Sequence, residues 1–392
     1  MADIESNIDS GLRIRSANTE YDGNSGDAIT VKGRFNAGLR FNEQFSTFLQ
    51  LDYVESFLKD KHSTALLYND NPFMFDTPGS DLNQLFAKYA WDDGSVKLVR
   101  QVITFGSERF IGDIDFWQND QTFDGVLIEQ GLFTSSTLQY AYVHNVNRIF
   151  GDRADQKLSS ADIRFEALAG VRPIIERGDH AIDGNFLHFE YNEFDYVKLA
   201  AYGYAVHNYD LPDFSNRVVG ASSEFNYKPG AIKYTGTLEF AWQQKQESTT
   251  RQWIPYRLVE GGIGIGKVDF SLRWEALEDR DGELFDTPLG SRHEFQGWAD
   301  AFSTSPAGGL DDFSVRTNIT WRPWRLDLRY HWFRSASVED LEFGQEFDMD
   351  LIFRPARKHE FKLRFADFSP DSEQTFRPFR STSLYFSYSF NI

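Results

Sequence analysis

The chain contains no cysteine among its 392 residues, and this absence excludes several kinds of protein. A disulfide-braced scaffold, a thiolate metal centre and a cysteine nucleophile all require a residue that the sequence lacks. Long hydrophobic runs are missing too: no stretch of about 18 uncharged apolar residues occurs, which excludes a transmembrane helix. A membrane barrel is not excluded, because its strands alternate apolar and polar residues instead of forming long apolar runs.

The sequence also lacks the motifs of common enzymes, and its basic residues do not outnumber its acidic ones. The eight His residues form no HExxH pair and there is no GxSxG elbow, so we expect no catalytic residues and no cofactor. Ser, His and acidic side chains that meet across a barrel wall, as in outer-membrane lipases or proteases, are kept as an alternative. The formal net charge of −19 argues against a general nucleic-acid binder.

What the chain does contain is alternation of apolar and polar residues from end to end. Between residues 325 and 332 the even positions are apolar and the odd positions are charged or histidine. In 315–322 one face carries Val315, Thr317, Ile319 and Trp321, and the other carries Arg316, Asn318, Thr320 and Arg322. The last strand aligns Leu384, Phe386, Tyr388, Phe390 and Ile392. With 16% aromatic and 25% charged residues, the composition suits strands that have one apolar and one wet face.

The alternation and its breaks divide the chain into about 18 predicted strands. They cover residues 10–18, 29–41, 43–57, 81–92, 95–106, 124–133, 135–148, 183–194, 197–208, 217–228, 231–245, 253–265, 267–279, 310–322, 324–337, 342–355, 358–369 and 378–391. The phase of 95–106 and of 197–208 is ambiguous. The links alternate between short turns, such as 92–94, 322–324 and 354–357, and long loops at about 58–80, 107–123, 149–182 and 280–309.

Short turns at one end and long loops at the other are typical of a bacterial outer-membrane barrel whose turns are periplasmic. We therefore predict that residues 1–392 form a single transmembrane antiparallel β-barrel domain. A soluble propeller or sandwich is less consistent with strands of 11–14 residues, since the usual strand has about 5–6. Aromatic residues near strand ends also suggest interface girdles, namely Tyr53, Trp91, Trp242, Trp274, Trp321, Trp332 and Tyr388.

The amino terminus shows no secretory signal, because Met1-Ala2-Asp3-Ile4 leads directly into polar sequence. A start methionine placed before a mature terminus has this appearance, so we expect that a signal peptide was removed.

Two local motifs resemble binding sites and are better explained by turns. Gly261 to Lys267 has the spacing of a phosphate-binding loop, but Val268 replaces the required hydroxyl and a strand follows where a helix should. We predict a tight turn with small lumen residues. Asp279, Asp281 and Glu283 resemble half of a calcium loop, and we expect an exposed acidic turn, with weakly bound calcium as an alternative.

Charged residues near the middle of the predicted strands are expected to face the lumen, because a charge facing lipid there costs about 2–4 kcal/mol. The basic set is Arg13, Arg15, Arg34, Arg100, Arg273, Arg316, Arg329 and Arg364, and the acidic set is Asp52, Glu239, Glu275, Asp327 and Asp348. Arginine and carboxylate ladders can simply brace the wall. As a set, we expect the arginines to form a pathway for carboxylates or phosphates.

Two predicted loops resemble the alginate-export family of outer-membrane porins. The first stretch runs from Val99-Arg100-Gln101 through Glu108-Arg109-Phe110-Ile111-Gly112 to 117–125, WQNDQTFDG. The second is 293–300, HEFQGWAD, followed by 306–312, PAGGLDD.

The resemblance implies an 18-stranded barrel that passes an acidic polysaccharide through an arginine-rich constriction, with loops folded over its ends. Arg100 and Arg109 carry over to the pathway. The loop motif carries over as Trp117, Asn119, Asp124, His293, Gly297, Trp298 and Asp300. For the aromatics Trp117, Phe123, Phe295 and Trp298, we expect packing of the loops against the rim. The chain is short for such an exporter, and 59 acidic against 40 basic residues argue against a purely electropositive tunnel.

From the sequence we predict a passive channel for anionic oligo- or polysaccharide, most simply an alginate-like polyuronate, formed by a monomeric barrel in outer-membrane lipid. A general diffusion porin for small solutes and a plugged surface binding protein are the alternatives.

Overall fold

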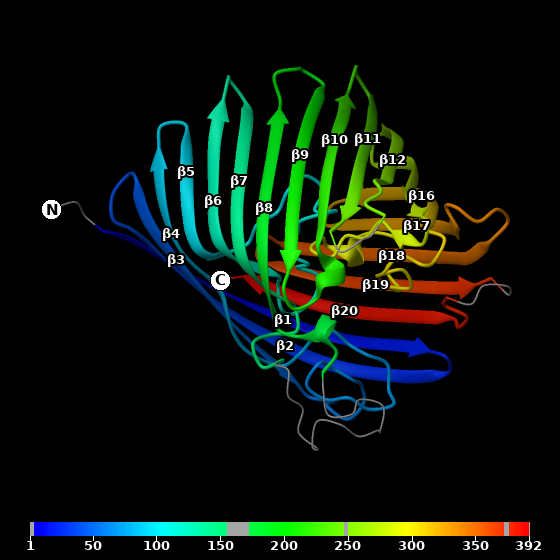
Figure 1. The fold of residues 1–392 in the computed structure, drawn as a ribbon. Coiled ribbons are helices and arrows are strands. Elements are labelled where there is room, and N and C mark those ends of the chain that lie inside the picture. Colours follow the sequence, from blue (N-terminus) through cyan, green and yellow to red (C-terminus); the bar gives the residue numbers. More distant parts are fainter. Residues whose placement is uncertain (1–3, 155–171, 247–249, 372–375, 392) are drawn as a thin grey trace.

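The protein, described by a computed structural model for residues 4–154, 172–246, 250–371 and 376–391, is a closed β-barrel (Figure 1). Eighteen strands form one antiparallel sheet. They are β1 (Glu5–Tyr21), β2 (Asn24–Arg40), β3 (Phe45–Ser56), β4 (Gly79–Trp91), β5 (Gly94–Gln101), β6 (Thr122–Leu132), β7 (Ser136–Asn147), β8 (Asp179–Tyr191), β9 (Val197–Asn208), β10 (Asn216–Tyr227), β11 (Ile232–Lys245), β12 (Ile254–Ile265), β13 (Val268–Leu277), β16 (Leu310–Trp321), β17 (Trp324–Arg334), β18 (Glu342–Ala356), β19 (His359–Pro370) and β20 (Ser381–Asn391).

The barrel closes where β1 pairs with β20, from Gly11↔Asn391 to Tyr21↔Ser381. Each other neighbouring pair follows the chain order, with β13 joined to β16 across a loop. That loop holds a hairpin of β14 (Asp279–Arg280) and β15 (Glu283–Leu284). Within the described residues no helix is both long and apolar enough to cross a bilayer.

The predicted asymmetry of the links is confirmed. Both described chain ends and the turns at 92–93, 266–267, 322–323 and 357–358 lie at one end of the barrel, which we call the turn end. The links 57–78, 102–121, 148–178 (in its described residues 148–154 and 172–178) and 278–309 lie at the opposite, loop end. Part of the third, residues 155–171, lies outside the described residues, as do Met1–Asp3 and Ile392 of the sequence predictions.

The first link at the loop end is shorter than predicted. We expected residues 19–28 to connect the first two strands, but β1 and β2 extend to a two-residue turn at Asp22-Gly23. Both residues have positive φ, 51° and 73°, as a tight hairpin turn requires, and the Asp-Gly pair is a favoured sequence for it.

Strand β5 explains the ambiguous phase of residues 95–106. Val99 has φ of 90°, in a region that β-branched residues rarely adopt, and Leu98 and Val99 are both exposed on the outer face. Lys97 and Arg100 therefore both point inward. The strand ends at Gln101, so the prediction that it continues to residue 106 was wrong: the chain leaves the wall there and enters the barrel. The strand predicted at 197–208 is confirmed with both bounds.

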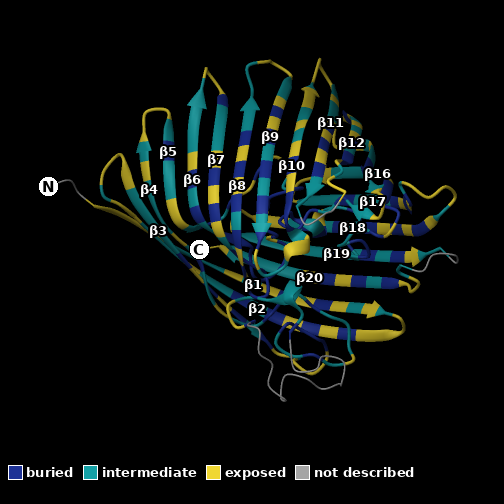
Figure 2. Cartoon of the chain, viewed as in Figure 1, coloured by how far each residue is buried: buried dark blue, intermediate teal, exposed yellow. Residues whose placement is uncertain are grey.

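The outer face of the barrel is apolar, and the inner face is polar. Buried and exposed residues alternate along the strands (Figure 2). On β13, Phe270 and Leu272 are each 43% exposed on the outer face, whereas the next residue, Arg273, points into the lumen. Trp91 and Trp321 are exposed at the turn end, and Trp242 and Trp332 near the loop end. A closed sheet with this outer surface is suited to lipid, and the chain is an outer-membrane β-barrel.

Candidate functional site

Two loops fold into the barrel and occupy its lumen. The first inner loop is residues 102–121, between β5 and β6, and the second inner loop is residues 278–309, between β13 and β16. We expected these segments to fold over the ends of the barrel. Instead their side chains reach wall residues in the middle of strands, because a dense set of charged groups on the inner face binds them there.

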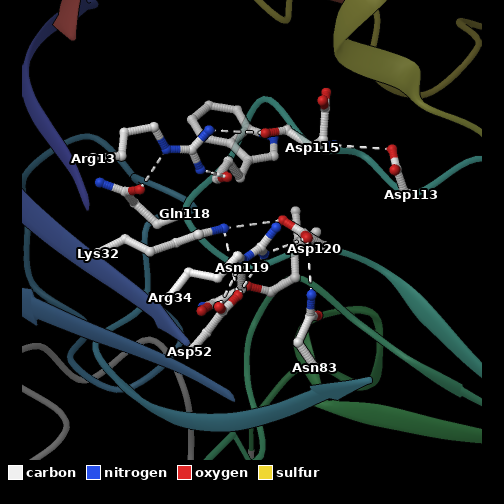
Figure 3. Close-up of polar contacts among 12 residues, drawn as sticks. Arg13, Lys32, Arg34, Asp52, Asn83, Asp113, Asp115, Gln118, Asn119 and Asp120 are labelled. Carbon is white, nitrogen blue, oxygen red and sulfur yellow. Dashed lines mark hydrogen bonds and ion pairs between the residues drawn. The ribbon is translucent and has the colours of Figure 1, made fainter. Parts of the chain in front are cut away.

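Asp120 anchors the first inner loop to β2 and β4 (Figure 3). Its Oδ1 lies 3.2 Å from Lys32 Nζ, and its Oδ2 lies 2.5 Å from Arg34 Nη2 and 2.9 Å from Asn83 Nδ2. Asp52 on β3 shares the same two cations. Burial raises the pKa of Asp120, but Lys32 and Arg34 outweigh it and hold that pKa well below its usual range. The anchor is therefore ionised.

Two arginines of β1 hold the same loop by other contacts. Arg13 Nε donates to Gln118 Oε1 at 2.7 Å, and its guanidinium also donates to the carbonyls of Asp115 and Trp117. Arg15 is 3% exposed, pairs with Asp76 at 2.9 Å and donates to the carbonyl of Phe116 in the first inner loop. Both arginines face inward as predicted, but they bind the protein's own loops.

The second inner loop places Trp298 between two arginines of the wall. The guanidinium carbons of Arg364 and Arg329 lie 3.8 and 4.3 Å from the ring centroid. The next backbone amide, of Ala299, donates to Glu346 at 2.7 Å, and that of Trp298 donates to Asp348 at 3.4 Å. The Glu346 carboxyl can approach the loop this closely because Gly297, with φ of 81°, has no Cβ at the place where that carboxyl lies.

The two inner loops are joined to each other through the Arg109–Glu275 pair. Arg109 Nε lies 2.8 Å from Glu275 Oε1, and the two side chains are 2% and 0% exposed. Gln296 of the second loop bonds to both, at 3.0 Å and 2.6 Å. Glu275 also accepts from Tyr256 at 2.7 Å. The loops and the wall therefore form one cross-linked body around a buried carboxylate.

Three arginines on the inner face of β16 and β17 gather around one carboxylate. Arg316, Arg325 and Arg329, which we call the arginine triad, all lie within 3.5 Å of Asp327. Their side chains are 36%, 39% and 18% exposed, whereas Asp327 is 5% exposed. Three guanidinium groups thus share one carboxylate, and the charge that faces the lumen at this place is positive.

Most of the remaining predicted residues form ion pairs or hydrogen bonds with other residues of the wall and the loops. Arg100 pairs with Asp124, which lies in β6 and not in a loop; Arg273 pairs with Glu260 and Glu275; and Arg364 pairs with Asp350. Glu239 accepts from Tyr202, Asn119 donates to the carbonyls of Thr77 and Ile149, and His293 contacts Asp300.

Arg15, Arg100, Arg109 and Arg364 are therefore each paired with a carboxylate of the wall or of a loop, and the pathway role of the arginines stays a prediction. The aromatics are also placed differently from expectation. Trp117 packs against Phe75 and Phe116, and Phe295 lies 4.6 Å from the guanidinium of Arg109, so both lie inside the barrel and not at its rim. Phe123 is a wall residue, in β6.

The acidic turn of the second inner loop is occupied by its own hydrogen bonds. Asp279 accepts from the amides of Gly282 and Gly308, and Glu283 accepts from Thr250. Among the described residues no three His, Asp or Glu are grouped to hold a metal ion. The glycine-rich segment is confirmed as strand, turn and strand, with the turn at Gly266-Lys267.

Sequence reasoning missed Arg325, Lys32 and Asp120. Arg325 lies on the polar face of its predicted strand, and this position indicates that it faces inward. It was not among the predicted lumen residues because it lies near the strand end and not in the middle. Lys32 also alternates inward. Asp120 has no local signal, because its partners lie 86 and 88 residues earlier in the chain.

Asp113, on the first inner loop, gives the lumen a pH-dependent charge. Burial raises its pKa, and Glu108 and Asp115 raise it further, to about 7. The folded protein thus holds this proton more tightly than the unfolded chain, and its stability falls as the pH rises from about 4 to about 7. Asp113 becomes negative above that range. We expect the anion preference of the channel to decrease between about pH 6 and pH 8. Reversal potentials measured across that range should show the decrease, and Asp113→Asn should reduce it; an unchanged pH dependence in the variant contradicts this assignment.

Solved structures resemble the chain in fold, whereas no protein-family model and no curated protein matches it. OpdK of Pseudomonas aeruginosa, solved with vanillate, is 16% identical, with a TM-score of 0.71 over 99% of both chains. OccK3 (OpdO) of the same organism is 12% identical, with a TM-score of 0.70 over 99% of this chain and 96% of that one. OccAB2 of Acinetobacter baumannii is 14% identical, with a TM-score of 0.71 over 99% of this chain and 98% of that one. These similarities show a shared porin fold. They do not bear on the alginate-export resemblance, which stays a prediction.

Proposed function

We propose that this outer-membrane barrel is a passive, energy-independent channel that prefers small solutes carrying a carboxylate. The observation that carries the proposal is the arginine triad, in which three guanidinium groups share the single carboxylate of Asp327 and two of the three arginines, Arg316 and Arg325, are more than a third exposed. Guanidinium groups match carboxylates in shape as well as charge. A solute carboxylate that reaches the triad therefore finds donors that the protein does not fully use.

The same geometry favours release. Asp327 lies 5% exposed behind the triad and lowers its net charge, so an anion is attracted without being held by all three cations at once. Conduction requires binding that is strong enough for entry and weak enough for exit. The lumen is also confined, and charges there act more strongly than at a surface exposed to bulk water.

Two solute classes follow from different observations. Small ring carboxylates are the first class: the inner loops occupy part of the lumen, and OpdK, which is similar in fold, was solved with vanillate, a small ring carboxylate. Polyuronate, the second candidate, is supported by the resemblance of the loop sequences to alginate-export porins. Competition by uronate oligomers against monomeric carboxylates separates the two classes.

The test is the reversal potential in planar bilayers under a salt gradient. We expect the native channel to prefer anions, and the triple variant Arg316→Ser, Arg325→Ser, Arg329→Ser to lose or reverse that preference, because Asp327 then dominates this part of the lumen. The barrel should still fold, since lumen substitutions disturb the lipid face little.

Arg357→Ser is the matched control, since Arg357 lies in the exposed turn that joins β18 to β19. It should leave the reversal potential unchanged. A native channel that prefers cations, or a triple variant with native selectivity, contradicts the proposal and favours a general porin. Absence of any open-channel current favours a plugged barrel.

A further inference from the structure

A cavity of about 470 Å³ lies at the loop end of the barrel, apart from the arginine triad. Its wall is made by the short 3-10 helix Pro212–Phe214, the last residue of β11, the β14–β15 hairpin and the later part of the second inner loop. We call it the mouth pocket, and the residues that matter for its chemistry are Asp213, Phe214, Lys245, Leu284, Asp286 and Thr304.

The mouth pocket is held in shape by bonds between its walls. Arg292 donates to Asp286 at 3.0 and 3.2 Å and to the carbonyl of Ser303 at 2.8 Å, and its guanidinium lies 5.6 Å from the ring of Phe214. Gln243 on β11 donates to the Asp286 carbonyl at 2.7 Å and accepts from its amide at 3.0 Å. Three separate segments are thus fixed relative to one another, and no ordering of the walls is needed when a ligand binds.

Lys245 is the unused cation of this pocket. Its side chain has no hydrogen bond or ion pair in the described parts of the chain, although Asp286, Asp213 and Glu283 all act on it electrostatically. Arg292 already neutralises Asp286. A half-buried ammonium without a direct partner is costly, and a ligand anion would satisfy it.

The other unused groups define what else the ligand carries. The side chains of Asp213 and Thr304 have no partner among the described residues, and they supply acceptors for hydroxyl groups. Phe214 and Leu284 supply an apolar surface for the carbon face of a ring. The volume lies within the range of about 300–1,000 Å³ that small-molecule sites occupy.

We propose that the mouth pocket binds a hydroxylated carboxylate, specifically a sugar acid of the hexuronate type, before the solute enters the lumen. The ligand carboxylate pairs with Lys245, its hydroxyl groups donate to Asp213 and Thr304, and its ring lies on Phe214 and Leu284. This inference rests on the proposed function, because it narrows the solute class, but it places the first contact at a separate site.

The experiment adds glucuronate to one side of single channels of known orientation and measures how it modulates the ion current. We expect saturable modulation from the loop side at lower concentration than from the turn side, and weaker effects from neutral glucose and from acetate. Lys245→Gln should weaken the apparent affinity for loop-side glucuronate about tenfold, the usual order for one charge-assisted hydrogen bond. Lys267→Gln, in the exposed turn at the opposite end, should leave that affinity at its native value.

Equal modulation from both sides, or glucose acting as strongly as glucuronate, overturns the mouth pocket. If Lys245→Gln does not fold, Asp213→Asn and Thr304→Val test the hydroxyl contacts instead, and native affinity in both overturns it as well. The reversal potential of the native channel in plain KCl is recorded in the same bilayers. It reports the proposed anion preference independently of any sugar, so the failure of one proposal is distinguishable from the failure of the other.

Discussion

Replacing Asp120 with Asn should detach the first inner loop from the barrel wall, raise the single-channel conductance and make the open current noisier. The carboxylate joins the loop to Lys32, Arg34 and Asn83 at once. Lys32 is 7% exposed and would keep only Asp52 as a counter-charge, at 3.4 Å. Removing one partner of a buried ion pair costs about 3–5 kcal/mol of folding free energy, and this weakens the attachment of the loop to β2 and β4.

Asp115→Asn is the matched control, because Asp115 lies on the same loop, five residues earlier, with an exposed side chain. Both variants remove one negative charge from the loop, so a change in anion preference common to both reports charge alone. A change in conductance and in the midpoint of urea unfolding should occur only in Asp120→Asn. If Asp120→Asn has the conductance of the native channel, the network in Figure 3 does not hold the loop.

The strands could be predicted from sequence because their environment changes with every residue. Each wall residue faces either lipid or lumen, so the apolar and polar alternation reports the position of every one of the eighteen barrel strands. Of the two strands whose phase was ambiguous, β5 is the one in which the alternation breaks. Val99 there adopts φ of 90°, which places two successive residues on the outer face. A backbone conformation that is rare for valine leaves no signature in residue type.

The inner loops could not be predicted in the same way. Their positions depend on ion pairs between residues far apart in the chain, such as Arg109 with Glu275 and Asp120 with Lys32. Alternation shows that an arginine faces inward, but it does not show whether a carboxylate on another element has already bound it. For this reason the inward orientation of the arginines could be predicted from the sequence. Which of them are paired with buried carboxylates and which are exposed to the lumen could be seen only in the structure.

Replacing Glu275 with Gln should be the most destabilising single change in the lumen and should affect both inner loops together. Glu275 is 0% exposed and serves Arg109, Arg273, Tyr256 and Gln296. The amide retains the shape but removes the charge, which leaves Arg109 buried at 2% exposure without its carboxylate partner. We expect a loss of about 3–5 kcal/mol in folding free energy, since an uncompensated buried charge remains. Urea unfolding of the barrel in detergent, followed by its heat-modifiable mobility, measures this loss.

Glu260→Gln separates the effect of burial from that of charge. Glu260 pairs with the same Arg273, at 3.4 Å, but is 26% exposed, so the identical substitution should cost only about 0–1 kcal/mol. The current should respond in parallel: Glu275→Gln frees the junction of the two loops and should produce frequent transitions to a higher conductance, whereas Glu260→Gln should keep the native open level. Equal effects of the two substitutions would mean that the loops are held by their apolar contacts and not by the buried Arg109–Glu275 pair.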